Sequence, residues 1–338
     1  MSSPVGQVRG GILDRVPEPL ALYFEMLRIR RVEEEIARKY PEQEMRAPVH
    51  LCIGQEAPPV GVSANLTLFD QALSGHRSHG QYLAKGGDLR RMISELYGRA
   101  TGCCRGRGGS QHLVDTSVGF AAAAPILAST LSIATGVAWT LKYRGGQDVA
   151  VAYFGDAACE EGVFHESLSF ASLHRLPIVF VCENNLYSVH SPLSERQPDR
   201  PISELALAHA MPGITVDGND VREVSRVAST AIDRAREGGG PTLLDCKTYR
   251  IVGHVGPGTE LDMGYRDQAE LDFWHARDPL TMEEGRLASQ ITNWNAAKDQ
   301  LERLVRSEIE DAFAFATSSA FPAPEEMLMD VYPAEESP

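Results

Sequence analysis

The sequence predicts an α/β fold, in which a mainly parallel sheet is covered by helices on both faces. Two short apolar runs, at residues 149–154 and 177–183, have the length and continuous hydrophobicity of strands that are buried on both sides. A helical pattern at 161–174 separates these two runs, and another helical pattern follows at 220–237. Strands that alternate with helices pair in parallel through right-handed crossovers, which place helices over both faces of the sheet.

The other expected elements complete this alternation. Residues 19–39 have apolar side chains at helical spacing, and so do residues 296–317. We expect a weak strand at 214–217 and a further strand at 242–249. Residues 116–141 contain no charged side chain, but Pro125 and several Ser and Thr residues interrupt the stretch. This stretch therefore predicts a buried loop and helix rather than a membrane span.

The chain of 338 residues divides into three expected parts. Residues 1–45 form an N-terminal helical arm, and residues 46–275 form the α/β domain. Residues 276–338 form C-terminal helices and a tail rich in Pro and Glu. The length allows one large domain with additional terminal helices.

Composition limits the classes of partner. The chain carries 46 acidic and 32 basic side chains, giving a formal charge of −14, which argues against nucleic acid as the main partner. The first residues contain no apolar run of the kind found in a signal peptide. The six cysteines form no C-x-x-C pair, as expected for reduced thiols in the cytoplasm. We therefore expect a cytoplasmic protein without a membrane partner.

Polar residues follow the two buried strands. Asp156 lies two residues after the first strand, and Asn184 and Asn185 directly follow the second. Ligands of parallel sheets bind at the carboxyl ends of the strands, and a few oxygen ligands favour Mg²⁺ over Zn²⁺. These residues therefore indicate a magnesium site and a phosphorylated ligand. Each taken alone is more typical of a helix cap or a turn.

The spacing of these residues matches a known pattern. Gly155-Asp156 and Asn184-Asn185, roughly thirty residues apart, resemble the thiamine-diphosphate motif. The surrounding segment is similar to the α subunit of the decarboxylating component of pyruvate, acetoin and branched-chain 2-oxoacid dehydrogenases. The resemblance covers about residues 20–317 and includes four further blocks in the family's order: HLCIGQEA at 50–57, GHRSHG at 75–80, GRGGSQH at 106–112 and YRIVGH at 249–254.

The resemblance implies the thiamine-diphosphate-binding fold, thiamine diphosphate and Mg²⁺ as cofactors, and roles for individual residues. The metal ligands would be the side chains of Asp156 and Asn185 and the backbone carbonyl of Tyr187. Proton transfer would involve His254 and His79, since imidazole titrates near neutral pH. The full set of expected cofactor contacts is His76, Arg77, Pro125, Leu127, Gly155, Asp156, Ala157, Ala158, Asn185, Tyr187 and His254.

Several positions depart from the family pattern. Ala157 replaces the second glycine of Gly-Asp-Gly, and its methyl group is tolerable only with ordinary backbone angles. Pro125 lies where a backbone carbonyl meets the aminopyrimidine, and proline retains that carbonyl. His76 lies where pyruvate enzymes carry a tyrosine. The loop after His254 has no serine, so control by phosphorylation of that loop is not expected.

The resemblance also implies a partner. In this family a glutamate that activates the aminopyrimidine comes from a separate β subunit, so we expect an α2β2 heterotetramer with sites at the α/β interfaces. The expected reaction is decarboxylation of a small 2-oxoacid and transfer of the acyl group to a lipoyl domain, and the expected further partner is a lipoyl acyltransferase. One alternative keeps the cofactor but ligates the acyl unit to an aldehyde or keto-sugar. Two others are a subunit without catalytic activity and a nicotinamide-dependent dehydrogenase, which lacks its G-x-G-x-x-G turn here.

Overall fold

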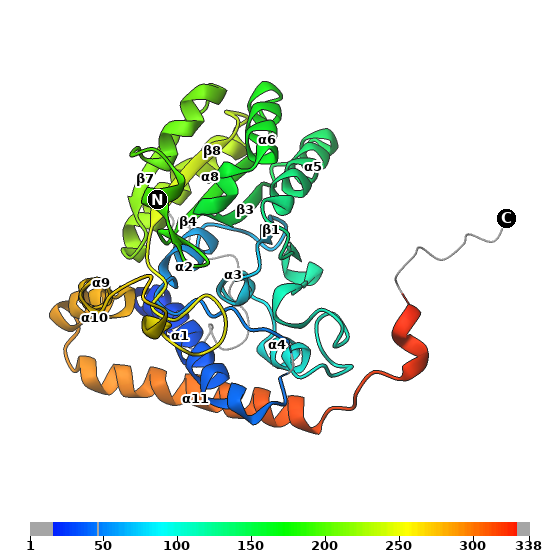
Figure 1. Cartoon of the computed structure of the whole chain (residues 1–338), viewed down its shortest axis with the longest axis vertical. Helices are drawn as coiled ribbons and strands as arrows, with labels where there is room; N and C mark the ends of the chain where they lie inside the picture. Colours follow the sequence, from blue (N-terminus) through cyan, green and yellow to red (C-terminus); the bar gives the residue numbers. More distant parts are fainter. Residues whose placement is uncertain (1–15, 46, 330–338) are drawn as a thin grey trace.

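The computed structural model describes residues 16–45 and 47–329 and places a six-stranded parallel sheet at the centre of the chain (Figure 1). The strands are β1 (Gln71–Ser74), β2 (Phe120–Ala123), β3 (Ala150–Gly155), β4 (Ile178–Asn184), β7 (Gly213–Asp217) and β8 (Thr242–Lys247). Their order across the sheet is β2-β1-β3-β4-β8-β7, and every pairing is parallel. The predicted α/β class and parallel sheet are therefore confirmed.

Helices cover both faces of this sheet. One face packs against α1 (Ala21–Lys39), α2 (Ala57–Ser63) and α8 (Val221–Arg236), and the other packs against α5 (Ser129–Arg144) and α6 (Gly162–Leu173). The side chains of β3 divide between the two cores, with Val151 and Tyr153 on the α8 side and Ala152 and Phe154 on the α5 side. This division explains the unbroken apolar run, because neither face of the strand contacts water.

Six further α-helices complete the fold of the described residues. They are α3 (His79–Ala84), α4 (Leu89–Leu96), α7 (Leu193–Arg196), α9 (Gln268–His275), α10 (Pro279–Gln290) and α11 (Trp294–Ser318). Of these, α4, α9, α10 and α11 lie in the lower part of the molecule in Figure 1. A short hairpin pairs β5 (Tyr187–Ser188) with β6 (Ser191–Pro192). Helix α11 packs against α1 and α4, so both ends of the described chain contact the same helical layer. The three-part division of the chain stays a prediction.

Two strands of the six-stranded sheet were not predicted. Strands β1 and β2 have only four residues each, which is too short for a periodic pattern to be visible. Their positions matter because β1 is a direct neighbour of β3 in the sheet. The loop that follows β1 therefore lies at the same carboxyl edge as the loops after β3 and β4.

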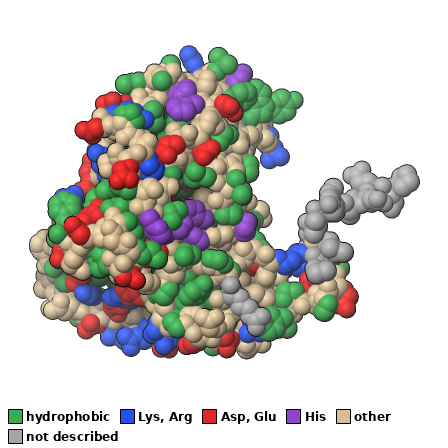
Figure 2. Space-filling model, in the orientation of Figure 1, with side chains coloured by type: hydrophobic (Ala, Val, Ile, Leu, Met, Phe, Trp, Pro, Cys, Tyr) green, Lys and Arg blue, Asp and Glu red, His purple; other side chains and the backbone are tan. Residues whose placement is uncertain are grey.

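The expectation of a buried loop and helix at 116–141 was partly wrong. The segment contains β2 and most of α5, and α5 buries only one side. Ile133, Trp139 and Tyr143 are exposed, Tyr143 to 87%. Phe170 and Leu173 of the neighbouring helix α6 are exposed as well, and Figure 2 shows hydrophobic side chains gathered over this corner of the molecule. Among the described residues, no helix is long and apolar enough to cross a membrane.

Candidate active site

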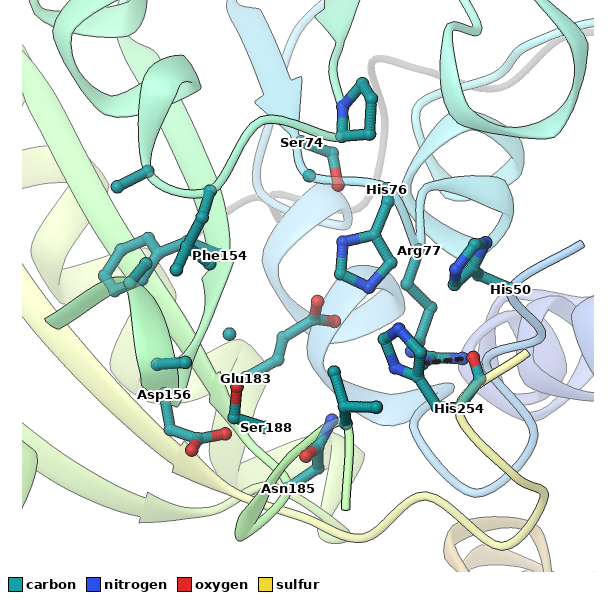
Figure 3. A pocket seen from close by; sticks show the side chains of 18 of the residues that line it. His50, Ser74, His76, Arg77, Phe154, Asp156, Glu183, Asn185, Ser188 and His254 are labelled. Carbon is teal, nitrogen blue, oxygen red and sulfur yellow. Dashed lines mark hydrogen bonds between the residues drawn. The ribbon is translucent and has the colours of Figure 1, made fainter. Parts of the chain in front are cut away.

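A cavity of about 370 Å³ opens at the carboxyl ends of β1, β3 and β4. Figure 2 shows histidine side chains gathered beside the hollow in this face, and Figure 3 shows the cavity from close by. The cavity is lined by His76, Arg77, Pro125, Leu127, Gly155, Asp156, Ala157, Ala158, Asn185, Tyr187 and His254. Every residue predicted to contact the cofactor thus lines one cavity, and His79 alone among the predicted site residues does not.

One side of the cavity, here called the strand-end wall, consists of residues 155–158, Asn185 and Tyr187. Parallel pairing of β3 and β4 places Gly155 opposite Glu183, so Asp156 and Asn185 leave neighbouring strands at the same edge. The two side chains lie near each other in Figure 3. Asn185 is held in place by its own amide, which donates to Gln55 Oε1 at 3.1 Å, while its Oδ1 accepts the Tyr187 N–H at 3.2 Å.

Asp156 is almost fully buried and forms an ion pair with Arg196 of α7. Burial raises the pKa of the Asp156 carboxyl, and the Arg196 guanidinium opposes that rise. The donor set on this wall is a carboxylate, an amide oxygen and a nearby backbone carbonyl. Such hard oxygen donors fit Mg²⁺, and a magnesium ion would take over the charge compensation that Arg196 now provides.

The backbone angles at Ala157 decide whether a methyl group is tolerated where the family has glycine. Residues Asp156–Glu160 form a single 3₁₀ turn, and Ala157 is not among the residues with a positive φ angle. Gly155 itself has φ −85° and ψ 165°, which any residue can adopt. A methyl group at position 157 is therefore accommodated without backbone strain.

The opposite side of the cavity, here called the histidine wall, consists of His50, His76, Arg77, Arg250 and His254. The three imidazole rings pack edge to face, with centroid distances of 4.7 Å for His50–His76, 5.1 Å for His50–His254 and 5.4 Å for His76–His254. They come from three loops that are far apart in the sequence. The edge-to-face packing fixes the orientation of each ring relative to the other two.

Burial and the charge of Arg77 keep these imidazoles neutral. Together they lower the pKa of His50 to about 3, that of His76 to about 2 and that of His254 to about 4. An anion bound beside Arg77 would offset this positive charge and raise all three pKa values towards neutrality. The histidines would then become effective proton carriers only when the cavity holds a negatively charged ligand.

Two buried guanidinium groups make the cavity attractive to anions. Arg77 donates to the carbonyl oxygen of Leu51 and, at 3.1 Å, to that of His254, and Figure 3 draws the bond to His254. Burial and the neighbouring Arg250 lower the pKa of Arg77 to about 9. Arg250 donates to Val189 O and to the Tyr265 hydroxyl, while its buried Nε has no hydrogen-bond partner among the described residues. A diphosphate would supply the acceptor that this N–H lacks.

The structure places His79 behind the histidine wall rather than in the cavity. Its side chain is fully buried at the start of α3, with Nδ1 2.6 Å from Glu33 Oε1 and Nε2 2.8 Å from Ser110 Oγ. Both ring nitrogens therefore have a protein partner. In this geometry His79 connects Glu33 to the loop at 108–112 and does not reach the cavity surface.

Pro125 and Leu127 follow β2 and form the edge of the cavity nearest to α5. Leu127 is 45% exposed and its neighbour Ile126 is 70% exposed. The apolar edge of the cavity therefore continues onto the exposed side of α5.

Three titratable residues that line the cavity were missed from the sequence: His50, Glu183 and Arg250. His50 and Arg250 both lie inside blocks that match the family, and that position was a signal that could have been used. Glu183 directly precedes the Asn-Asn pair. It is buried, it accepts from Gln81 Nε2 at 2.7 Å, and burial raises its pKa to about 8. Nothing in the sequence shows that its side chain turns into the cavity.

Comparison with known proteins identifies the family of the chain. The family described as dehydrogenase E1 component matches residues 24–325. The α subunit of acetoin:2,6-dichlorophenolindophenol oxidoreductase from Bacillus subtilis is 38% identical over 325 residues, covering 96% of each chain. The α-3 subunit of the chloroplastic pyruvate dehydrogenase E1 component from Arabidopsis thaliana is 38% identical, over 93% of this chain and 74% of the relative. The corresponding α subunit from Rhizobium meliloti is 35% identical, over 93% and 90%.

These relatives match almost the whole chain, including both walls of the cavity and the helices around them. The chain therefore belongs to the dehydrogenase E1 component family, the thiamine-diphosphate-dependent decarboxylating components of 2-oxoacid dehydrogenases, and aligns with their α subunits.

Proposed function

We propose that this chain binds the diphosphate end of thiamine diphosphate, together with Mg²⁺, and acts with a β subunit on a small 2-oxoacid whose acyl group passes to a lipoyl domain. The observation that carries the proposal is that Asp156 and Asn185 face the same cavity as Arg77 and His254. Metal ligands, anion-binding groups and a titratable imidazole are the parts that such a site requires.

Both walls contribute to binding the cofactor in this proposal. When bound, thiamine diphosphate supplies the electron sink for decarboxylation. Asp156, Asn185 and the carbonyl of Tyr187 hold the magnesium ion, and Arg77 and Arg250 hold the diphosphate oxygens. Arginine suits this role because its fixed fork of N–H groups matches phosphate geometry.

The imidazoles of the histidine wall supply the groups for proton transfer. His254 and His50 lie in one cluster with His76, and the bound diphosphate would raise their pKa values by offsetting Arg77. We assign proton transfer to His254. We assign His79 a positioning role, because it acts on the cavity through Ser110 rather than by direct contact.

The proposed partner is a β subunit in an α2β2 heterotetramer. Support comes from the exposed apolar side chains on α5 and α6, which continue to the cavity edge at Ile126 and Leu127. An apolar surface of this kind is typical of a protein interface. A lipoyl acyltransferase would be the further partner that receives the acyl group. All six cysteines are free, as expected of a protein in the reducing cytoplasm.

The test is to co-express the chain with its β subunit and to titrate the complex with thiamine diphosphate and Mg²⁺ in a calorimeter. We expect binding that needs both subunits and is lost in Asp156→Asn. The exposed Asp199→Asn serves as the matched control and should bind normally. Normal binding by Asp156→Asn would contradict the assignment of this wall to the metal.

A second assay on the same complex identifies the acyl acceptor. Reductive acylation of a lipoyl domain supports the dehydrogenase reaction, whereas a carbon–carbon ligation product formed from an aldehyde supports a carboligase. Pyruvate and acetoin should be compared as substrates, because relatives of both kinds match this chain about equally well. The expected result is lipoyl acylation without ligation.

A further inference from the structure

Two consecutive cysteines lie in the turn between α4 and the loop that lines the cavity. Cys103 and Cys104 are both partly buried, whereas the other four cysteines of the chain are buried. The sulfur atoms of Cys103 and Cys104 lie within 4.8 Å of each other. This turn therefore holds the two most accessible thiols of the chain, and they are direct neighbours.

The backbone around the two cysteines is fixed by the buried carboxylate of Glu95. Its Oε2 accepts the N–H groups of Cys104 at 2.7 Å and Gly106 at 2.9 Å, and its Oε1 accepts those of Gly108 at 2.7 Å and Gly109 at 3.1 Å. Since both oxygens are already occupied, Glu95 is a structural acceptor and not a third ligand for a metal ion. The chemistry at this turn rests with the two sulfur atoms.

The two thiols are not equivalent. Cys104 donates through Sγ to the backbone oxygen of His112 at 2.8 Å. A hydrogen bond from the Cys103 thiol lowers the pKa of Cys104, so Cys104 is the thiol that ionises more readily once its hydrogen bond to His112 is released. Cys104 is thus the more reactive sulfur, and Cys103 is placed to react with whatever forms on it.

The turn is connected to the cavity through the residues that follow it. Ser110 Oγ lies 2.8 Å from Nε2 of His79, and Gln111 Nε2 lies 3.1 Å from Nδ1 of His50. Gln111 and His50 both line the cavity. The Cys104–His112 hydrogen bond closes this loop, so a change at Cys104 acts directly on the segment that orients two histidines.

We propose that Cys103 and Cys104 are a redox modification site that takes hydrogen peroxide or an organic hydroperoxide and becomes a disulfide between neighbouring residues. The Cys104 thiolate attacks one peroxide oxygen, the O–O bond breaks, and the leaving oxygen takes a proton. The Cys103 thiol then attacks the resulting sulfenic acid, an S–S bond forms, and water leaves. Each dithiol loses two electrons and two hydrogens, and one peroxide is reduced.

Such a disulfide would strain the turn. Neighbouring Cα atoms are about 3.8 Å apart, whereas disulfides usually join Cα atoms that are about 4.4–6.8 Å apart. The turn must therefore distort, the hydrogen bond to His112 is lost, and Gln111 and Ser110 shift. Strained disulfides are also easily reduced, so the modification is reversible by thiols.

The test treats the complete chain, alone and in complex with its β subunit, with stoichiometric hydrogen peroxide. We expect the intact mass to fall by two hydrogen atoms and peptide mapping to find Cys103 and Cys104 joined. Activity should fall about tenfold, as expected when a segment that positions site residues moves by a fraction of an ångström. Dithiothreitol should restore both mass and activity.

Single variants identify the two roles. Cys103→Ala should stop at a sulfenic acid that dimedone traps, and Cys104→Ala should resist peroxide. The matched control Cys159→Ala removes a buried thiol and should still form the disulfide. Free Cys103 and Cys104 after peroxide treatment that inactivates the enzyme, or equal oxidation of Cys104→Ala, would overturn the proposal. The mass measurement needs no catalysis, so it separates failure of this site from failure of the proposed function.

Discussion

The two walls of the cavity are built in different ways. The strand-end wall follows directly from the sheet, because β3 and β4 are neighbours and their carboxyl ends place Asp156 and Asn185 together. The histidine wall comes from three loops. Two of them follow strands of the sheet, with His76 and Arg77 after β1 and Arg250 and His254 after β8, whereas the loop that carries His50 follows no strand. The order of this wall depends on side-chain packing and on hydrogen bonds to backbone carbonyls, such as that from Arg77 to His254 O.

The two walls therefore have different expected roles, the strand-end wall in binding the metal ion and the imidazoles of the histidine wall in proton transfer. The strand-end wall offers oxygen atoms on a rigid frame, which suits a metal ion that requires fixed geometry. The histidine wall offers neutral imidazoles whose pKa values respond to the charge beside them. We therefore expect changes in the first wall to remove cofactor binding. Changes at the histidines of the second wall, as opposed to its two arginines, should slow the reaction without removing binding.

The largest effect is expected at Asp156. Asp156→Ala removes the only carboxylate of the strand-end wall and leaves Arg196 without its buried partner. We expect affinity for thiamine diphosphate and Mg²⁺ to fall at least about 100-fold. Calorimetric titration of the α/β complex measures this, with chelation by EDTA as a parallel arm. A fall in kcat with unaltered affinity would contradict the assignment of cofactor binding to the strand-end wall.

The next largest effect is expected at His254. His254→Gln removes the titratable ring but keeps a polar side chain, so kcat should fall about 100-fold, as for loss of a general acid or base. Affinity for thiamine diphosphate should change little. Steady-state kinetics and titration on the same preparation provide the test, with the exposed His275→Gln as control. Equal loss of affinity in His254→Gln and Asp156→Ala would show that the walls do not act separately.

A pH-dependent effect is expected at Glu183, which lies between the two walls in Figure 3. In the unfolded chain this carboxyl loses its proton near its ordinary pKa of 4.5, whereas in the folded chain its pKa is about 8. The folded state thus binds more protons between these values, and stability decreases as pH rises through this window. Glu183→Gln removes this dependence.

The variant should therefore gain about 4 kcal/mol in stability relative to the wild type between pH 5 and pH 8.5. Urea unfolding of the free chain at both pH values measures the gain. Glu166→Gln, at an exposed position, should show no such change. A constant difference between Glu183→Gln and the wild type at the two pH values would mean that Glu183 is ionised in the folded chain.

The smallest effect is expected at Arg196, which pairs with Asp156 and Glu160. Its guanidinium compensates the charge that a magnesium ion would otherwise compensate, so the two compete for Asp156. Arg196→Gln should tighten Mg²⁺ binding about three- to tenfold, the scale of one modest electrostatic coupling. Arg200→Gln, a nearby arginine that bonds to Gln197, is the control. Weaker Mg²⁺ binding in Arg196→Gln would show that Arg196 supports the site rather than competing for it.

The sequence predicted one wall more completely than the other. Asp156 and Asn185 each directly follow a long buried strand, so the rule for parallel sheets was sufficient to bring them together. His76 and Arg77 were found only through the family resemblance, because β1 before them is too short to be predicted. His50 and Arg250 were missed although they lie in matching blocks. Arg250 directly follows the strand predicted at 242–249, so the same rule could have found it. His50 follows no predicted strand, and its approach to the cavity depends on tertiary packing, which no local pattern records.

His79 illustrates the remaining limit. Its block, GHRSHG, shows two histidines three residues apart, yet only His76 faces the cavity. Helix α3 begins at His79, and this helical turn directs its ring towards Glu33 and Ser110. The neighbouring element, and not the motif itself, decides which of the two rings meets the ligand.

The exposed apolar surface on α5 and α6 has a consequence for how the cell makes this protein. A chain that leaves the ribosome with Trp139, Tyr143 and Leu173 facing water presents the kind of surface that chaperones and proteases recognise. Copies synthesised in excess of the β subunit should therefore be short-lived or aggregate. The supply of the two subunits must be matched in time and amount, so the abundance of one subunit sets the usable abundance of the other.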